Sequence, residues 1–431
     1  MLQETNFWDT EIETLPPHKL KELQEKRLQA LVRTAYQKTP FYREKFDKAN
    51  VKPEDIHTLA DIPKLPLTRY IEDFVATPIE QKLAVPWTSV TDIMTTSGTI
   101  SGFTQPVANT AIDIEENFAT LARTMRMAGV KSDDIIQFLS PWDFIIPAVK
   151  KLGCKIIPSM AGRMKLDDQI KLAKLIKSTI AFAMPSYMLR FVQRAQELGI
   201  NLKNDTTLRL AVLGGEPLAA PIKKKLEEET GIDFYDVYGF AEVMGVAGEC
   251  TQKEGLHIWA DHYLPEIIDL DTLQPLEPGM EGELVITTLA KEAMPLIRYR
   301  TGDITKLFAP EPCPCGRTHP KMEAVRGRIY DLIRIQGLKL LPSDIEDIMV
   351  DMPELGGEYR IIVDKKEEMD ALKIKAEYRD EVLDLSALEE KVKAIFEQRT
   401  SLSCQVELVP AGSLPQTQFK AQRIIKTYEK A

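Results

Sequence analysis

The chain has 431 residues, of which 44% are hydrophobic and 28% charged, and its formal net charge at pH 7 is -10. This length predicts roughly two or three domains, and the acidic balance argues against nucleic acid or an anionic membrane surface as the main partner. No apolar run approaches the ~20 residues that span a bilayer and the N-terminus lacks a signal-peptide pattern, so we expect a cytoplasmic protein.

The N-terminal half begins with a helical segment and continues as an alternation of strands and helices. Helical periodicity covers residues 17–48. From about residue 90 to 240, short runs of strand-forming residues alternate with amphipathic helices, which predicts right-handed crossovers and a largely parallel sheet. The predicted strands are Ile135–Leu139, Lys155–Ile157, Ile180–Ala183, Leu208–Leu213 and Phe234–Val237, and the helices include 167–177 and 219–229.

The pattern changes after Leu256. Runs at 265–270, 282–289 and 295–305 are separated by turns, which suggests a smaller antiparallel or barrel-like region. From residue 331 onward an α+β order follows: a strand pair within 331–340, helix 342–350, strands 359–364 and 372–378, helix 385–398 and strand 405–409. We therefore predict a large α/β domain over residues 1–327, with mixed or parallel sheets flanked by helices plus the barrel-like region, and a small α+β domain over residues 328–431.

Three polar segments follow predicted strands. Thr95–Gly102 is rich in hydroxyls and glycine and could wrap a polyphosphate, although a flexible turn has the same composition, and it lacks the lysine of a Walker A loop. Leu213–Pro217 lies at a strand-to-helix junction, where open α/β sheets bind ligands and where plain turns also occur. Arg298–Asp303 ends in a carboxylate that could hold a ribose or could serve as a turn residue.

The segment Tyr238–Gly245 is the most informative one. It places an aromatic ring, a glycine and a carboxylate after the apolar run Ile232–Val237. Tyr238 could cover a purine, Gly239 could let the backbone approach a ligand, and Glu242 could hold Mg²⁺ beside phosphates. An ordinary strand-to-loop transition would look similar.

The cysteines point to a metal. Cys313 and Cys315 are separated by one proline, a spacing that suits a metal better than a disulfide framework. With Cys250 and His257, which have six residues between them, they make a Cys₃His set, which is typical of a closed structural zinc site. His319 is an alternative source of the imidazole, and a reduced turn without metal is the other interpretation.

Taken in order, these segments resemble the adenylate-forming superfamily of acyl-CoA synthetases, adenylation domains and luciferases, and most of all its phenylacetate–coenzyme A ligase family. The likeness extends from about residue 20 to 427. It is carried by Met184–Met188, Tyr238–Gly245, Gly255–Trp259, Asp261 and His262, Pro265–Ile268, and Arg298–Asp303. The resemblance implies an ATP-dependent carboxylate–CoA ligase for an arylacetic or other aromatic acid, which forms an acyl-adenylate and yields acyl-CoA, AMP and pyrophosphate.

The resemblance also implies a nucleotide-binding set. Its members are Ser97, Gly98, Thr99, Gly215, Glu216, Pro217, Asp236, Tyr238, Gly239, Asp303 and Arg328. The first three would hold the phosphates, and the last two the ribose. The others would line the adenine, with Asp236 near its exocyclic amine and Tyr238 over its face.

Two side chains would carry the chemistry in this resemblance. Glu242 would bind Mg²⁺, and Lys420 would enter the site from the small domain. A substrate carboxylate must attack the α-phosphorus although both partners are anionic, so the transition state needs these cations. The thiolate of coenzyme A then needs room to attack the mixed anhydride, which a domain that is mobile about Tyr330 and Asp331 would provide.

The sequence departs from the family pattern at three places. The phosphate loop, Ile100–Pro106, lacks the usual lysine, and Phe419 replaces the glycine that usually precedes the catalytic lysine. Leu139–Phe144 replaces a longer glycine-rich segment that borders the acyl pocket. The aromatics that could wall such a pocket, or could belong to the core, are Trp142, Phe144 and Tyr187.

Two other functions stay open. The acyl group could pass to a carrier protein or another nucleophile instead of coenzyme A. Alternatively, the chain could be a nucleotide-binding module with little catalysis, which the missing loop lysine would favour. The expected partners are a small carboxylic acid, ATP and CoA, with a homodimer as one option and no nucleic acid or membrane.

Overall fold

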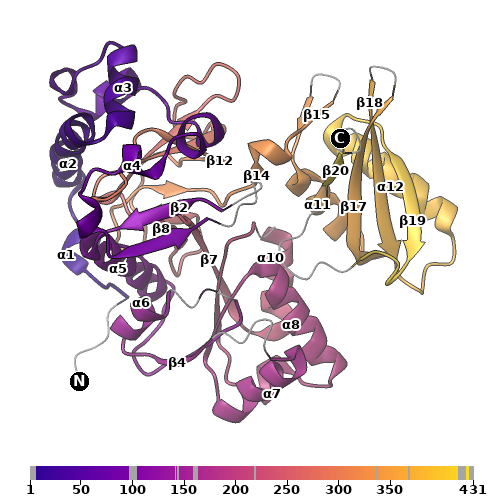
Figure 1. Cartoon of the computed structure of the whole chain (residues 1–431). Coiled ribbons are helices and arrows are strands. Elements are labelled where there is room, and N and C mark those ends of the chain that lie inside the picture. The colour runs from indigo at the N-terminus through magenta and orange to yellow at the C-terminus, as the bar shows by residue number, and fades with distance from the viewer. Residues whose placement is uncertain are drawn as a thin grey trace.

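A computed structural model describes residues 6–96, 104–140, 142, 145–158, 164–217, 220–335, 338–366, 369–415 and 424–426. Figure 1 shows a large N-terminal body and a smaller C-terminal unit, drawn in orange and yellow, that stands beside it. This arrangement agrees with the predicted α/β class with one large and one small domain. Within the described part of the chain, none of the helices has the length and apolar character needed to cross a membrane.

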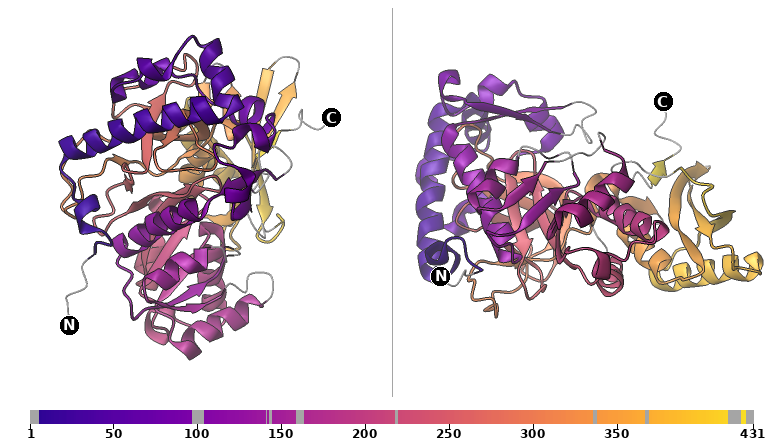
Figure 2. Two further views of the ribbon diagram at one scale, coloured as in Figure 1. Left: turned by 60° about the vertical axis from the view of Figure 1, so that its left-hand side comes forward. Right: turned by 90° about the horizontal axis from the view of Figure 1, so that it is seen from below.

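The helical periodicity predicted over residues 17–48 corresponds to two helices. The helices are α2 (Pro17–Lys38) and α3 (Pro40–Lys48), and they lie along the outside of the body (Figure 2). Thr39 is extended between them and its side chain accepts a hydrogen bond from the Tyr42 N–H. Pro40 explains the break, because a proline has no N–H to continue α2 but fits the first turn of α3.

Short elements surround these helices. They are α1 (Thr10–Glu13), η1 (Pro53–Asp55), η2 (Leu59–Lys64), η3 (Tyr70–Val75), α4 (Ile79–Lys82) and η4 (Trp87–Ser89). A hairpin of β1 (Asp92–Thr95) and β2 (Pro106–Asn109) follows and leads into α5 (Ala111–Met127). The Thr110 hydroxyl and the Asp113 carboxylate form a capping box that starts α5.

The central feature is an eight-stranded mixed sheet with the order β13-β9-β8-β7-β6-β5-β3-β4. Strands β4, β3, β5, β6 and β7 are parallel, as predicted, and β8, β9 and β13 extend the sheet in antiparallel fashion. The strands are β3 (Ile135–Phe138), β4 (Lys155–Ile157), β5 (Ile180–Ala183), β6 (Leu210–Gly214), β7 (Asp233–Phe240), β8 (Met244–Glu249), β9 (Leu256–Ile258) and β13 (Lys321–Met322). The helices are α6 (Ile146–Lys151), α7 (Leu166–Ile176), α8 (Pro185–Glu197), α9 (Leu202–Asp205) and α10 (Ala220–Thr230).

A second sheet of four antiparallel strands has the order β10-β11-β12-β14. Its strands are β10 (Tyr263–Ile268), β11 (Glu281–Thr288), β12 (Tyr299–Lys306) and β14 (Gly327–Arg328). All strand pairs of this sheet are antiparallel, as predicted, and the described strands follow one another in an open order. The run predicted from residue 295 becomes a strand only at Tyr299, because Arg298 has a positive φ of 45° and its guanidinium bonds to Glu266.

The C-terminal unit has its own core and a four-stranded sheet with the order β19-β18-β17-β20. It contains η6 (Ile329–Asp331), β15 (Ile333–Ile335), β16 (Leu338–Leu340), α11 (Pro342–Val350), β17 (Leu355–Lys366), β18 (Met369–Tyr378), α12 (Leu385–Thr400), β19 (Gln405–Pro410) and β20 (Ile424–Lys426). Helices α10 and α11 meet where the two units join (Figure 1). Ion pairs from Arg334 and Lys339 to Asp271 also cross this junction.

Candidate active site

Three residues of the predicted nucleotide set meet between the two sheets of the large body. The Tyr238 hydroxyl on β7 donates a 2.6 Å hydrogen bond to Oδ2 of Asp303 on β12. Nε of Arg328 on β14 donates to Oδ1 of the same carboxylate at 3.0 Å. Asp303 is therefore oriented by a neutral and a cationic donor, and burial together with the charge of Asp303 raises the pKa of Tyr238 well above its usual value.

The stretch after Tyr238 differs from the sequence prediction. Strand β7 continues to Phe240 instead of ending at Val237, and it turns directly into β8. A Cβ at Gly239 would lie 1.6 Å from the carbonyl oxygen of Met244. The close approach that requires glycine at 239 is thus to the neighbouring strand of this hairpin.

Glu242 lies in this turn as a buried carboxylate, 5% exposed. The Tyr299 hydroxyl donates to its Oε1 at 2.9 Å, and burial raises the pKa of Glu242 above its usual range. Two lysines that no motif in the sequence indicated interact with its charge: Lys82 and Lys291. Burial lowers the pKa of Lys82 to about 8 and also lowers the pKa of Lys291. Because these lysines and Glu242 interact electrostatically, the charge of each group affects the pKa of the others.

The end of β6 places Glu216, another candidate residue, against the start of α8. Glu216 follows β6, and its Oε2 accepts a 3.1 Å hydrogen bond from the backbone N–H of Ser186, at the start of α8. Its other oxygen, Oε1, is buried and has no hydrogen-bond partner among the described residues. Gly215 has a positive φ of 82°, which favours glycine, and Pro217 is exposed at the end of the turn.

Asp236, on β7, is surrounded by charged neighbours. Its backbone N–H donates to Oε2 of Glu249 at 2.7 Å, and Glu249 also forms an ion pair with Lys223. Burial, with a contribution from the Glu249 charge, raises the pKa of Asp236 to about 7. This carboxylate therefore changes its charge close to neutral pH. The remaining predicted residues, Ser97, Gly98, Thr99 and Lys420, lie outside the described residues.

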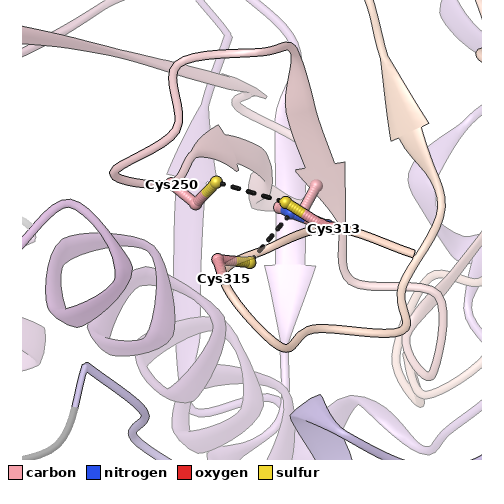
Figure 3. Close-up of side chains that lie close together, drawn as sticks. Cys250, Cys313 and Cys315 are labelled. Carbon is pink, nitrogen blue, oxygen red and sulfur yellow. Dashed lines mark hydrogen bonds between the residues drawn. The ribbon is translucent and has the colours of Figure 1, made fainter. Parts of the chain in front are cut away.

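The predicted metal ligands lie together at the far edge of the eight-stranded sheet (Figure 3). Their ligand atoms all lie within 4.8 Å of one another; the residues are Cys250, His257, Cys313 and Cys315. Sγ of Cys250 is 3.8 Å from Sγ of Cys313, and Sγ of Cys315 is 3.4 Å from Nε2 of His257. The distances are short enough for one ion to contact all four atoms, and three sulfurs with one imidazole nitrogen match the preference of zinc.

The neighbours of the cluster decide which histidine faces it. Nδ1 of His257 donates to the carbonyl oxygen of His319 at 3.0 Å, which leaves its Nε2 lone pair directed at Cys315. Both ring nitrogens of His319 form hydrogen bonds outside the cluster. Nε2 donates to the Ile12 carbonyl at 2.9 Å, and Nδ1 accepts from the Ala260 N–H at 3.0 Å. His257 therefore offers the ligand atom, and the backbone carbonyl of His319 orients the His257 ring by accepting its Nδ1–H.

The same loop holds the N-terminal segment. Arg317, two residues after Cys315, forms a buried ion pair with Glu13 in which both side chains are at most 1% exposed. The Thr318 N–H donates to the Glu13 carbonyl at 3.2 Å, and the Arg317 guanidinium lies over the Phe7 ring. The Cys-Pro-Cys loop is thus joined to residues that are 300 positions away in the sequence.

Known proteins match almost the whole chain. The AMP-binding enzyme family model matches residues 14–290, and the model of the AMP-binding enzyme C-terminal domain matches residues 337–427. The phenylacetate–coenzyme A ligase of Thermus thermophilus is 32% identical, with 97% of this chain and 99% of that protein covered. The corresponding ligase of Aromatoleum evansii is 37% identical over 86% of this chain and 84% of that protein.

Solved structures match over the same length. The structure of a 2-hydroxyisobutyryl-CoA ligase in the postadenylation state with an acyl-AMP has a TM-score of 0.89 and 25% identity, and covers 99% of this chain and 94% of that one. The same ligase in the thioesterification state, with acyl-AMP and CoA, has a TM-score of 0.72 at 25% identity, and covers 98% and 93%.

Proposed function

Since this chain belongs to the AMP-binding enzyme family and, within it, to the phenylacetate–coenzyme A ligases, we propose that it joins an arylacetic or other aromatic acid to coenzyme A. It is an ATP-dependent, AMP-forming acid–CoA ligase that works through an acyl-adenylate. The observation that carries the aromatic substrate is the 32% identity to a phenylacetate–coenzyme A ligase over 97% of this chain.

The cluster of Tyr238, Asp303 and Arg328 supports a nucleotide site between the two sheets. Asp303 would accept the ribose hydroxyls while Arg328 holds its carboxylate in place, and the Tyr238 ring would cover the adenine. The edge beside it, formed by Gly215, Glu216 and Pro217 with Gly239 and Asp236, would line the base. The free Oε1 of Glu216 is a buried acceptor that a bound amine or hydroxyl could satisfy.

The negative charge of the phosphates would be neutralised by a metal ion and a lysine and would be stabilised by hydrogen bonds. Glu242 would bind Mg²⁺, whose positive charge would stabilise the ionised form of this buried carboxylate. Ser97, Gly98 and Thr99 would donate hydrogen bonds to the phosphates. Lys420 would neutralise the charge that develops as the substrate carboxylate attacks the α-phosphorus and pyrophosphate leaves.

The small domain would then have to move. We place the boundary near Gly327 and Arg328, the two residues of β14, and the hinge directly after this strand, at Tyr330 and Asp331. The Tyr330 ring lies on Gly302, where a Cβ would be 2.8 Å from its Cε2, so the hinge touches the segment that carries Asp303. The higher TM-score against the postadenylation state than against the thioesterification state of one relative supports a second position for this domain.

The Cys₃His cluster would hold a structural zinc ion. Four protein ligands from Cys250, His257, Cys313 and Cys315 would leave no position for a substrate, so the ion would stabilise the edge of the sheet. The loop contacts to Glu13 suggest that it also fastens the N-terminal segment. A cytoplasmic location and a homodimer remain predictions.

A panel of arylacetic, benzoic and aliphatic acids tests the proposed function. We expect AMP formation that requires both an acid and coenzyme A, with the highest kcat/KM for an aromatic acid. Acid-dependent pyrophosphate exchange without CoA-dependent AMP release would point to another acyl acceptor. ATP binding without exchange against any acid would contradict a catalytic role.

A further inference from the structure

The carboxyl edge of the parallel strands continues past the nucleotide cluster. Strands β7, β6, β5 and β3 are neighbours in that order and run in the same direction, so their carboxyl ends share one edge with Tyr238. Ligands of open α/β sheets bind along such an edge. If the proposed function is correct, an acid whose carboxylate reaches the nucleotide extends its acyl group over the ends of β6, β5 and β3.

The Trp142 side chain extends along this edge from the end of β3 to the end of β6. It follows β3, yet its indole lies against Gly215, which follows β6, with β5 between them in the sheet. A Cβ on Gly215 would lie 2.6 Å from Cη2 and 2.7 Å from Cζ2 of the indole, so the ring occupies space that only glycine leaves open. The indole therefore bridges the positions over which the acyl group would extend.

Contacts with β5 hold the ring in place. The indole meets the Phe182 ring edge to face, with 5.9 Å between the centroids and an interplanar angle of 76°. Ser140, two residues before Trp142, is held as well, because its Oγ accepts a 2.8 Å hydrogen bond from the Met184 N–H. Trp142 is only partly buried, so the ring is a wall of this edge and not a fully enclosed core residue.

We propose that Trp142 is a specificity-determining residue that limits the length of the acyl group. Its indole takes up the space beyond the first few atoms of the acid, so the enzyme selects compact acids and rejects those with longer chains. Discrimination of this kind is worth about 10- to 200-fold per methylene in an apolar pocket.

Two series of acids measure the effect: phenylacetate, 3-phenylpropionate and 4-phenylbutyrate, and butyrate, hexanoate and octanoate. In each series, kcat/KM of the wild-type enzyme should fall with length. Trp142→Ala should raise the ratio of kcat/KM for the longest acid to that for the shortest by about 10-fold or more, with an unchanged KM for ATP. Trp142→Phe should give an intermediate ratio, and Trp87→Ala, at a ring that is 51% exposed, should leave the ratio unchanged.

A double-mutant cycle tests the contact itself. Gly215→Ala places a methyl group against the indole and should lower kcat/KM for every acid. Part of that loss should disappear in the Trp142→Ala background, whereas the backbone strain at the positive φ of residue 215 is common to both backgrounds and cancels.

The outcomes separate this inference from the proposed function. If wild type and Trp142→Ala both form acyl-CoA with the same length preference, Trp142 does not set specificity and the proposed function stands. Additive effects of the two substitutions would contradict the contact on which the inference depends. If neither protein activates any acid of the two series or of the wider panel of arylacetic, benzoic and aliphatic acids, the proposed function fails and this inference fails with it.

Discussion

The Cys₃His cluster and the proposed nucleotide site are built in different ways, although most of their described residues lie on the same large body. The cluster takes its ligands from β9, the residue after β8 and the nearby loop before β13, and its neighbours are hydrogen-bonded to one another. The proposed nucleotide site would take Tyr238 from one sheet and Asp303 and Arg328, which are hydrogen-bonded to one another, from the other sheet, and Lys420 would come from the small domain. If both proposals are correct, the structural site lies within one edge of one sheet, whereas the catalytic site is divided between parts that would move relative to each other.

Loss of a metal ligand should have the largest effect on this comparison. We expect Cys315→Ser to lower the free energy of unfolding by at least about 3 kcal/mol, because a structural zinc ion contributes its binding energy to folding. Zinc content by mass spectrometry and thermal unfolding measure the change. Cys404→Ser, a cysteine outside the cluster, is the control. Wild-type protein without bound zinc would contradict the proposed site.

Replacement of Lys420 should affect the other region instead. We expect Lys420→Ala to slow acid-dependent pyrophosphate exchange by about 10²- to 10³-fold, the size of effect seen when one charge-stabilising donor is lost. ATP binding and the melting temperature should stay close to wild type. Lys393→Ala serves as control, since this lysine forms ion pairs with Glu389 and Glu390 on its own helix α12. Full exchange activity in the Lys420 variant would rule out its role.

A change at Asp303 should weaken nucleotide binding without touching the cluster. Asp303→Asn replaces a carboxylate that accepts from both Tyr238 and Arg328. A hydrogen bond to a charged group is worth about 1.5–3 kcal/mol, so KM for ATP should rise by about one to two orders of magnitude. Tyr238→Phe removes only one donor and should raise it less. An unchanged KM in both variants would place the nucleotide elsewhere.

The smallest effect should be a pH dependence of stability at Asp236. Its pKa is about 7 in the folded protein and 3.8 for an ordinary aspartate, so the folded state keeps the proton that the unfolded state loses. The stability that this group contributes is complete below pH 4 and declines as the pH rises to 7. Asp236→Asn should therefore gain stability relative to wild type between pH 5 and 8, on the order of 1 kcal/mol once solvent screening at the partly exposed edge is included.

Urea unfolding at pH 5, 6, 7 and 8 measures this trend. Asp205→Asn is the matched control, because hydrogen bonds lower the pKa of Asp205 and its titration is complete below this range. The difference between wild type and Asp205→Asn should stay constant across the four pH values. A constant difference for Asp236→Asn as well would show that Asp236 is ionised throughout.

Local patterns were sufficient for most of the elements. The strands at Ile180–Ala183 and Lys155–Ile157 and the helix at 342–350 have the predicted bounds, because a short apolar run or an amphipathic repeat marks each one. Predicted element bounds differ from the structure where a proline or a contact with a distant residue interrupts the local pattern. Pro40 divides the predicted helix, and Arg298 delays a strand because its guanidinium bonds to Glu266.

The sequence by itself determined the family and the class of reaction, and it predicted a Cys₃His set with two candidate histidines, because these depend on residue types at particular spacings. Only the tertiary structure decided which histidine faces the sulfurs, that two lysines lie near Glu242, and that the Trp142 ring lies on Gly215. These contacts join residues on different strands and sheets, and the spacing along a chain does not specify which distant side chains the folded core will bring together.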